Sequence, residues 1–236
     1  MIRRRPLLVA TITFIATTLF NVTVAQKGDV AFPQLPDSPF NYAKVTLPTY
    51  IDRESLELAD NTPTTNVLTD EGATLGRVLF YDKQLSKTNT TSCASCHVQR
   101  DGFSDRRRFS KGFEGRSTTR NSMNLANLRY SNVKRDEPGF FWDERAATLE
   151  QQVLMPIQDE IEMGMKLNGL EDKLQQLPYY PPLFKAAFGS AIVTSDRIAK
   201  SLAQFLRSMT SFNSKFDRVK RDDEKFTDRE ELGASL

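Results

Sequence analysis

The sequence predicts an all-α fold, and three observations lead to that prediction. No stretch of useful length alternates apolar and polar residues in the way a half-buried β-strand does. Several stretches instead repeat apolar residues at the three- and four-residue spacing of an amphipathic helix. Serine or threonine residues that can cap a helix precede these stretches. With 39% hydrophobic and 26% charged residues, the 236-residue chain also has the composition of a soluble globular protein.

Residues 1–25 are expected to be a secretory signal peptide rather than part of the fold. Three arginines at residues 3–5 precede an apolar run over residues 7–20, and small residues end at Ala25. The alternative is an uncleaved anchor, which we favour less because the run is shorter than the roughly 20 residues that span a bilayer. We therefore expect a periplasmic protein without a stable membrane anchor.

Removing this segment changes how the charge of the chain is interpreted. It takes three arginines and no acids from a chain of formal charge +2, which leaves −1. No basic footprint for nucleic acid remains, so we expect no nucleic-acid partner. The densest basic patch is then residues 106–108, which we interpret as a solvated loop, with an electrostatic docking patch as the alternative.

The next elements are an arm and a helix. Residues 26–64 are rich in proline, which breaks long helices, and predict an extended N-terminal arm that wraps the domain, with one short helix near residues 51–58. Thr69 can cap a helix that ends near residues 81–82 and buries Leu75, Val78 and Leu79.

The middle of the chain predicts long loops, and its last third predicts helices. Residues 98–120 are polar and contain three glycines, and residues 121–127 continue irregularly. A loop of that length beside a binding motif is often functional. The first expected helix covers residues 146–154 and is stopped by Pro156, and the second covers 167–177. A turn at 179–182 precedes the third, over 183–188. The last covers 196–210 and is capped by Thr194 or Ser195.

The chemistry of the chain is concentrated in Cys93-Ala94-Ser95-Cys96-His97. These five residues contain both cysteines and the only histidine of the sequence. A C-x-x-C-H run is the attachment signature of a c-type haem, in which two thiols bind the vinyl groups and the histidine binds the iron. A thioredoxin-like redox pair would need a βαβ context, and a structural zinc site would need a fourth ligand.

The C-terminal residues resemble an earlier segment. The stretch Thr227 to Leu236 echoes residues 69–79, the helix that precedes the haem motif. Coincidence in a helix-prone segment is the alternative, but we favour a tandem of two haem domains. The expected organisation is a haem domain over residues 65–225 and a truncated start of a second cytochrome c-like domain over 226–236, with a frayed tail.

Further motifs make the chain resemble the bacterial dihaem cytochrome c peroxidase family, which includes the methylamine dehydrogenase maturation oxidase. The resemblance covers about residues 65–236 and matches the N-terminal haem domain of that family. The matching stretches are Leu75 to Phe80, Ser92 to His97, Thr119 to Ser122, Phe141 to Ala146, Leu149 to Gln152, Pro156-Ile157 and Glu162-Met163.

The resemblance implies a role for each matching residue. His97 would be the proximal iron ligand of a haem c that is bound covalently to Cys93 and Cys96. Glu162 would be the distal acid–base group, although a surface acid is the plainer interpretation of an acidic stretch. Gln152 and Pro156 would line the distal pocket. Trp142 would be an electron bridge, with a core residue as the alternative, and Arg145 would be a haem-propionate partner, with an ion pair to Asp143 as the alternative. Asn121 would be a calcium ligand.

The implied function is a periplasmic c-type haem peroxidase. It would reduce hydrogen peroxide to water with electrons from a small cytochrome c or a cupredoxin. A homodimer is one possible assembly. The chain has no second histidine to close the distal side, so we expect an open site or a weak ligand. The alternatives are a monohaem electron-transfer cytochrome c, with one of four methionines as sixth ligand, or an incomplete fragment of a dihaem enzyme. These methionines are Met123, Met155, Met163 and Met165.

Overall fold

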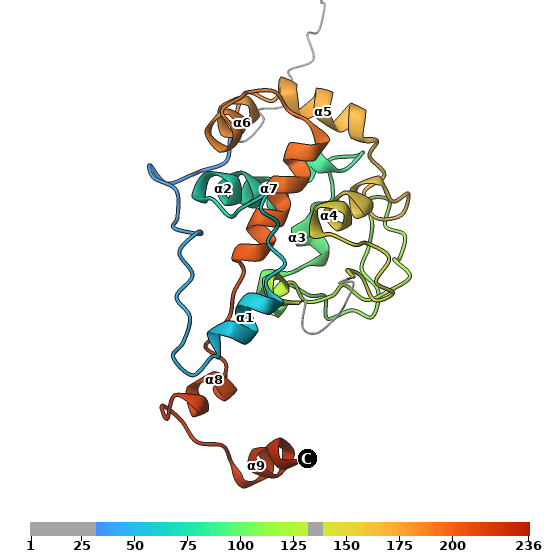
Figure 1. The fold of residues 1–236 in the computed structure, drawn as a ribbon. Coiled ribbons are helices and arrows are strands. Elements are labelled where there is room, and N and C mark those ends of the chain that lie inside the picture. The colour runs from blue at the N-terminus through green and yellow to red at the C-terminus, as the bar shows by residue number, and fades with distance from the viewer. Residues whose placement is uncertain (1–31, 132–138) are drawn as a thin grey trace, which may run out of the picture. The chain divides into compact units, whose positions relative to one another are not determined.

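The computed structural model describes residues 32–131 and 139–236, which form nine α-helices, three short 3₁₀ helices and isolated β-bridges but no β-sheet (Figure 1). The predicted all-α fold is therefore confirmed. The predicted signal peptide lies outside the described residues. The helices are α1 (Arg53–Ala59), α2 (Asp70–Tyr81), η1 (Lys83–Leu85), α3 (Cys93–Cys96), η2 (Gln99–Asp101), η3 (Leu128–Tyr130), α4 (Leu149–Gln158), α5 (Leu167–Gln176), α6 (Tyr180–Phe188), α7 (Ser195–Ser208), α8 (Lys215–Lys220) and α9 (Asp228–Ser235).

The helices α2 and α7 form the centre of the fold, and Figure 1 shows α7 between α2 and α4. Both begin where the sequence predicted, because the hydroxyl of Thr69 accepts from the Gly72 N–H and that of Thr194 accepts from the Arg197 N–H. A Cβ atom on Gly76 would lie 1.9 Å from the carbonyl oxygen of Ser201. The two backbones can therefore approach this closely only because residue 76 is glycine.

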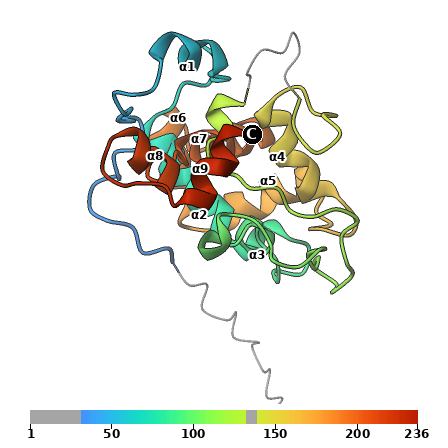
Figure 2. The same cartoon turned by 90° about the horizontal axis from the view of Figure 1, so that it is seen from below.

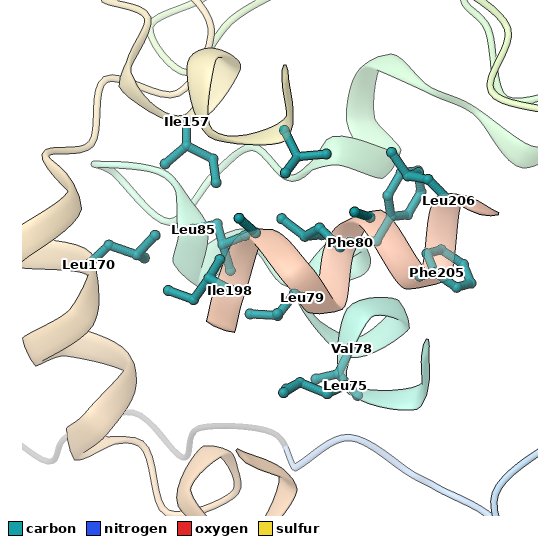
Figure 3. Packing of buried hydrophobic residues seen from close by; sticks show 14 of the residues in the cluster. Leu75, Val78, Leu79, Phe80, Leu85, Ile157, Leu170, Ile198, Phe205 and Leu206 are labelled. Carbon is teal, nitrogen blue, oxygen red and sulfur yellow. The ribbon is translucent and has the colours of Figure 1, made fainter. Parts of the chain in front are cut away.

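The hydrophobic core lies where these two helices meet α4, α5 and α6 (Figure 3). The predicted stripe on α2 is confirmed, since Leu75 and Leu79 are fully buried and Val78 nearly so. The core side chains labelled in Figure 3 come from four α-helices and η1, and they are Leu75, Val78, Leu79, Phe80, Leu85, Ile157, Leu170, Ile198, Phe205 and Leu206. Burial of such side chains stabilises each by roughly 1.5–3 kcal/mol relative to exposure.

Two predicted helix boundaries were wrong, and proline is the reason in both cases. Pro156 does not stop α4, because it removes one N–H donor near the end of the helix while Asp159 N–H still bonds the Met155 carbonyl at 3.0 Å. The predicted turn at residues 179–182 is instead the start of α6. Its prolines occupy the first helical turn, where the N–H groups have no partner in any helix.

Residues of the N-terminal segment contact the central helices. The Ala43 N–H donates to the Asp70 carboxylate at 2.8 Å, and the Tyr42 ring meets the Phe205 ring edge-on at 6.3 Å. The helix expected near residues 51–58 is α1. Figure 2 shows the helices α8 and α9 near the C-terminus. An ion pair between Lys215 and Glu230 at 2.5 Å joins them.

The tail differs from the frayed segment that we expected. Residues 228–235 form the helix α9, which begins with a capping box between Thr227 and Glu230. All of its residues are exposed, so it buries no apolar face, as expected. The capping box and the ion pair with Lys215 are therefore the contacts that hold α9, without burial of an apolar face.

A buried polar network ties α7 to α4 and to the arm. Arg207, which is 1% exposed, forms an ion pair with Glu150 at 2.6 Å and donates to the Asn61 side chain at 2.9 Å. Asn66 links Glu150 to Gln204, and Gln204 accepts from the Thr69 cap. Each buried charge thus has a partner, and the network joins α4 to α7 through satisfied polar contacts.

None of the helices within residues 32–131 and 139–236 is long and apolar enough to cross a membrane.

Candidate haem site

The helix α3 is a single turn that carries the C-x-x-C-H motif. Its first turn is held by a capping box between Ser92 and Ser95, in which the Ser92 N–H donates to the Ser95 hydroxyl at 3.0 Å. One helical turn separates Cys93 from Cys96, so both thiols project from the same side of the backbone. His97 follows as the residue that ends the helix.

The His97 ring is oriented by two backbone carbonyls. Its Nδ1 lies 2.9 Å from the Met123 oxygen and 3.0 Å from the Phe103 oxygen. Carbonyl oxygens only accept, so Nδ1 carries the proton and donates to them, which leaves Nε2 as the free acceptor. Burial lowers the pKa of the His97 imidazole and keeps the ring neutral. A neutral, oriented imidazole is the form that binds a metal ion.

The two thiols are free and protonated. Burial and the neighbouring Cys96 thiol raise the pKa of the Cys93 thiol to about 12, and burial raises that of Cys96. A reactive redox pair needs a lowered thiol pKa, so this environment does not favour the thioredoxin-like alternative. No group of three or more His, Cys, Asp or Glu side chains in the described part of the chain could hold a metal ion.

A cavity of about 430 Å³ opens above these residues. Its floor is apolar and includes Phe80, Leu202 and Leu206 from the two central helices. All nine side chains singled out in the sequence line it, namely Cys93, Cys96, His97, Asn121, Trp142, Arg145, Gln152, Pro156 and Glu162. A mostly apolar cavity of this size, with a few convergent polar groups, is typical of a cofactor site.

Glu162 lies in the wall of the cavity on the turn that follows α4. The loop of residues 98–120 holds this turn, because the Phe113 N–H donates to the Glu162 carbonyl at 3.0 Å. A Cβ atom on Gly112 would lie 1.6 Å from the Ile161 carbonyl oxygen, so only glycine allows this approach. Burial raises the pKa of Glu162, and the charge of Asp159 adds to the effect while that of Arg145 opposes it. These contacts oppose the plainer interpretation of Glu162 as a surface acid.

Trp142 and Arg145 line the same cavity from a strained turn. Trp142 is 60% exposed and donates from Nε1 to the Asn121 carbonyl at 2.9 Å, so it is not a core residue. Phe141 has a φ of 74°, a conformation that side chains other than glycine rarely adopt and that often marks functional sites. The Arg145 guanidinium stacks on the Phe141 ring at 3.6 Å and pairs with Asp143 at 2.7 Å.

Gln152 and Pro156 are one helical turn apart on α4, so they present neighbouring side chains to the cavity. Asn121 has a different environment. Its side-chain nitrogen donates to the carbonyls of Asp105 at 3.2 Å and Arg107 at 2.8 Å, which ties it to the long loop. Its proposed role as a calcium ligand stays a prediction.

Sequence reasoning missed the buried Asp105 beneath the motif. Its carboxylate accepts from the Arg107 guanidinium at 2.7 Å and from the Ser110 hydroxyl at 2.8 Å. These hydrogen bonds, with that of Arg107 as the largest contribution, lower the pKa of Asp105 to about 2. The sequence signal that could have indicated this residue is an Asp two positions before Arg107, as in an Asx turn. In the structure the Asp105 carboxylate accepts from the Arg107 N–H at 2.9 Å.

An all-helical fold that encloses a C-x-x-C-H turn in a deep apolar cavity defines a cytochrome c-like haem domain. Comparison with known proteins specifies the family. The family model described as di-haem cytochrome c peroxidase matches residues 70–225, and the chain belongs to this family. The family binds haem c.

Individual relatives agree with this assignment. The methylamine utilization protein MauG of Methylophilus methylotrophus is 36% identical over 174 residues, which cover 73% of this chain and 50% of MauG. The cytochrome c551 peroxidase of Nitrosomonas europaea is 34% identical over 160 residues, covering 68% of this chain and 46% of that protein. A crystal structure of a MauG-like protein associated with microbial copper homeostasis superposes with a TM-score of 0.68 at 33% identity, covering 80% of this chain and 53% of that one. The chain therefore spans about half the length of the relatives that it matches.

Proposed function

We propose that this chain is the peroxidatic haem domain of a periplasmic c-type peroxidase that reduces hydrogen peroxide to water. The single observation that carries the proposal is the convergence of the thiols, His97 Nε2 and Glu162 on one apolar cavity. Family membership supports it, because relatives such as the cytochrome c551 peroxidase of Nitrosomonas europaea are peroxidases. The electrons would come from a small cytochrome c or a cupredoxin.

The residues present fit a covalently bound haem c. Cys93 and Cys96 would hold it through thioether bonds, and His97 would supply Nε2 to the iron because Nδ1 is already engaged by two carbonyls. The apolar floor of the cavity would exclude water from one side of the ring. When bound, the haem would supply the redox chemistry, namely the two electrons that cleave the O–O bond of peroxide.

Glu162 is the proton-handling group in this proposal. Peroxide cleavage needs a base that takes a proton from one oxygen and returns it to the other, which leaves as water. The partly buried Glu162 carboxylate can do both from one position, and its raised pKa makes it a stronger base for taking the first proton. Gln152 and Pro156 would shape the pocket around the peroxide, and Trp142, exposed at the mouth, would carry electrons between the haem and a partner.

The decisive experiment uses the full chain loaded with haem. We expect it to bind cyanide or carbon monoxide and to turn over peroxide with a reduced small cytochrome as donor. In Glu162→Gln we expect turnover to fall by about 100-fold or more, the usual contribution of a general acid–base, while cyanide still binds. The matched control is Glu160→Gln, an exposed acid on the same turn, which should keep wild-type turnover.

Electron transfer by a single haem is the second candidate, and one observation favours it. Met163 is 3% exposed and lines the cavity directly after Glu162, so its thioether is available as a sixth ligand. Met123 is the weaker candidate, because its carbonyl is engaged with His97. A low-spin ferric resting spectrum that Met163→Leu converts to high spin, without peroxide turnover, would favour the carrier over the peroxidase.

A further inference from the structure

The turn that carries Glu162 is held by a carboxylate at its base. One oxygen of Asp159, Oδ1, accepts from the Ile161 N–H at 2.8 Å and from the Glu162 N–H at 2.9 Å. The Asp159 carbonyl accepts from the N–H groups of Met163 at 3.2 Å and Gly164 at 2.8 Å. Since the Glu162 carbonyl is bound by Phe113, the peptide groups on both sides of Glu162 are fixed.

Asp159 is the residue that ends α4, and its carboxylate caps the turn that follows. Hydrogen bonds to a charged acceptor are stronger than those to a neutral one, so a carboxylate suits the two N–H donors. An asparagine could accept the same two N–H bonds as a neutral acceptor.

We propose that Asp159 is a positioning residue for Glu162. The two N–H bonds that its carboxylate accepts fix the turn that presents the Glu162 side chain to the cavity. The inference rests on the proposed function of Glu162 as the proton-handling group.

The test compares Asp159→Asn and Asp159→Ala in the haem-loaded full chain. The order of the turn is followed by the protection of the Ile161 and Glu162 amides from hydrogen exchange. Asp159→Asn keeps an acceptor for both N–H bonds, so we expect turnover within about threefold of wild type and unchanged protection of the two amides. Asp159→Ala loses both, and turnover should fall by about tenfold or more.

The controls separate position from folding and from the proposed function. Glu160→Gln removes an exposed charge from the same turn and should leave the amide protection and the turnover unchanged. Thermal unfolding of each variant shows whether Asp159→Ala is folded; if it is not, Asp159→Gln, whose longer side chain displaces the acceptor, replaces it. Wild-type turnover in the folded variant, or a loss of turnover in Asp159→Asn as large as that in Asp159→Ala, would overturn the inference. Absence of turnover in the wild type would instead refute the proposed function, and the amide protection would still test the role of Asp159.

Discussion

At the scale of single residues, backbone carbonyls and one buried acid prepare the haem motif. The Met123 and Phe103 carbonyls fix the tautomer of His97, and Phe103 adopts a φ of 59° to present its oxygen. Asp105 lies beneath the motif and interacts electrostatically with both His97 and Cys96. The orientation of the iron ligand is therefore set by residues outside the C-x-x-C-H run.

Asp105 gives the first prediction, which concerns stability in acid. The folded pKa of about 2 is below the ordinary value of 3.8, so the ionised form stabilises the fold above pH 4 and this contribution is lost as the pH falls toward 2. We expect Asp105→Asn to lower the free energy of unfolding at pH 7 by about 2 kcal/mol and to flatten its pH dependence between 4 and 2.

Urea unfolding at several pH values measures this effect. The matched control is Asp196→Asn, an acid that is 67% exposed and forms only a helical ion pair with Lys200. That variant should change the free energy of unfolding by less than about 0.5 kcal/mol. Equal changes in the free energy of unfolding in the two variants would show that the hydrogen bonds of Asp105 do not stabilise the fold more than an exposed ion pair does.

At the scale of elements, two close contacts place the wall of the cavity. The ion pair between Arg207 and Glu150 fixes α4, and with it Gln152 and Pro156, against α7. The contact of Gly112 with Ile161 places the long loop against the turn that carries Glu162. A loop of more than 20 residues thus has a defined structural role, which is to hold the acid in the cavity wall.

The second prediction concerns this loop. In Gly112→Ala the new Cβ would meet the Ile161 carbonyl, so the loop and the turn must separate and the bond from Phe113 to Glu162 must weaken. We expect peroxide turnover to fall by about tenfold or more and the free energy of unfolding by about 1–3 kcal/mol. Gly169→Ala on α5 is the control, because its Cβ would meet no atom within 4 Å and alanine favours a helix. Full turnover in Gly112→Ala would contradict the role given to the loop.

At the scale of the whole molecule, the cavity is enclosed by segments that are far apart in the sequence. Its walls include Phe80 of α2, Leu125 of the irregular segment, Val153 of α4 and Leu206 of α7. A ligand that fills an apolar cavity of this size packs against its lining and adds apolar contacts to the folded state. We therefore expect the stability of the fold to depend on the cofactor.

The third prediction follows from this dependence. A variant with both Cys93→Ser and Cys96→Ser should retain no haem on a denaturing gel and should unfold at a lower temperature than the loaded chain. A ligand that binds only the folded state stabilises it by mass action, and a covalent one cannot dissociate. Ser92→Ala next to the motif keeps both thiols and should keep the haem. Equal melting temperatures of the loaded chain and the double variant would show that the cofactor does not stabilise this fold.

The sequence by itself determined the helices and the chemistry of the motif. Thr69 and Thr194 cap the helices as predicted, because a cap depends on the residues of one turn. The predictions at Pro156 and at residues 179–182 failed, because whether a proline ends or begins a helix depends on which N–H groups the fold leaves unpaired. The local pattern of C-x-x-C-H likewise sufficed to predict a haem site.

Only the tertiary structure decided how that site is built. No spacing in the sequence indicates that the Met123 and Phe103 carbonyls orient His97, that Asp105 lies beneath the motif, or that Gly112 touches the turn of Glu162. These contacts join segments of the chain that are brought together by the packing of α2, α4 and α7. The physical reason is that a cap is satisfied within one helical turn, whereas a cavity wall exists only after distant helices have packed.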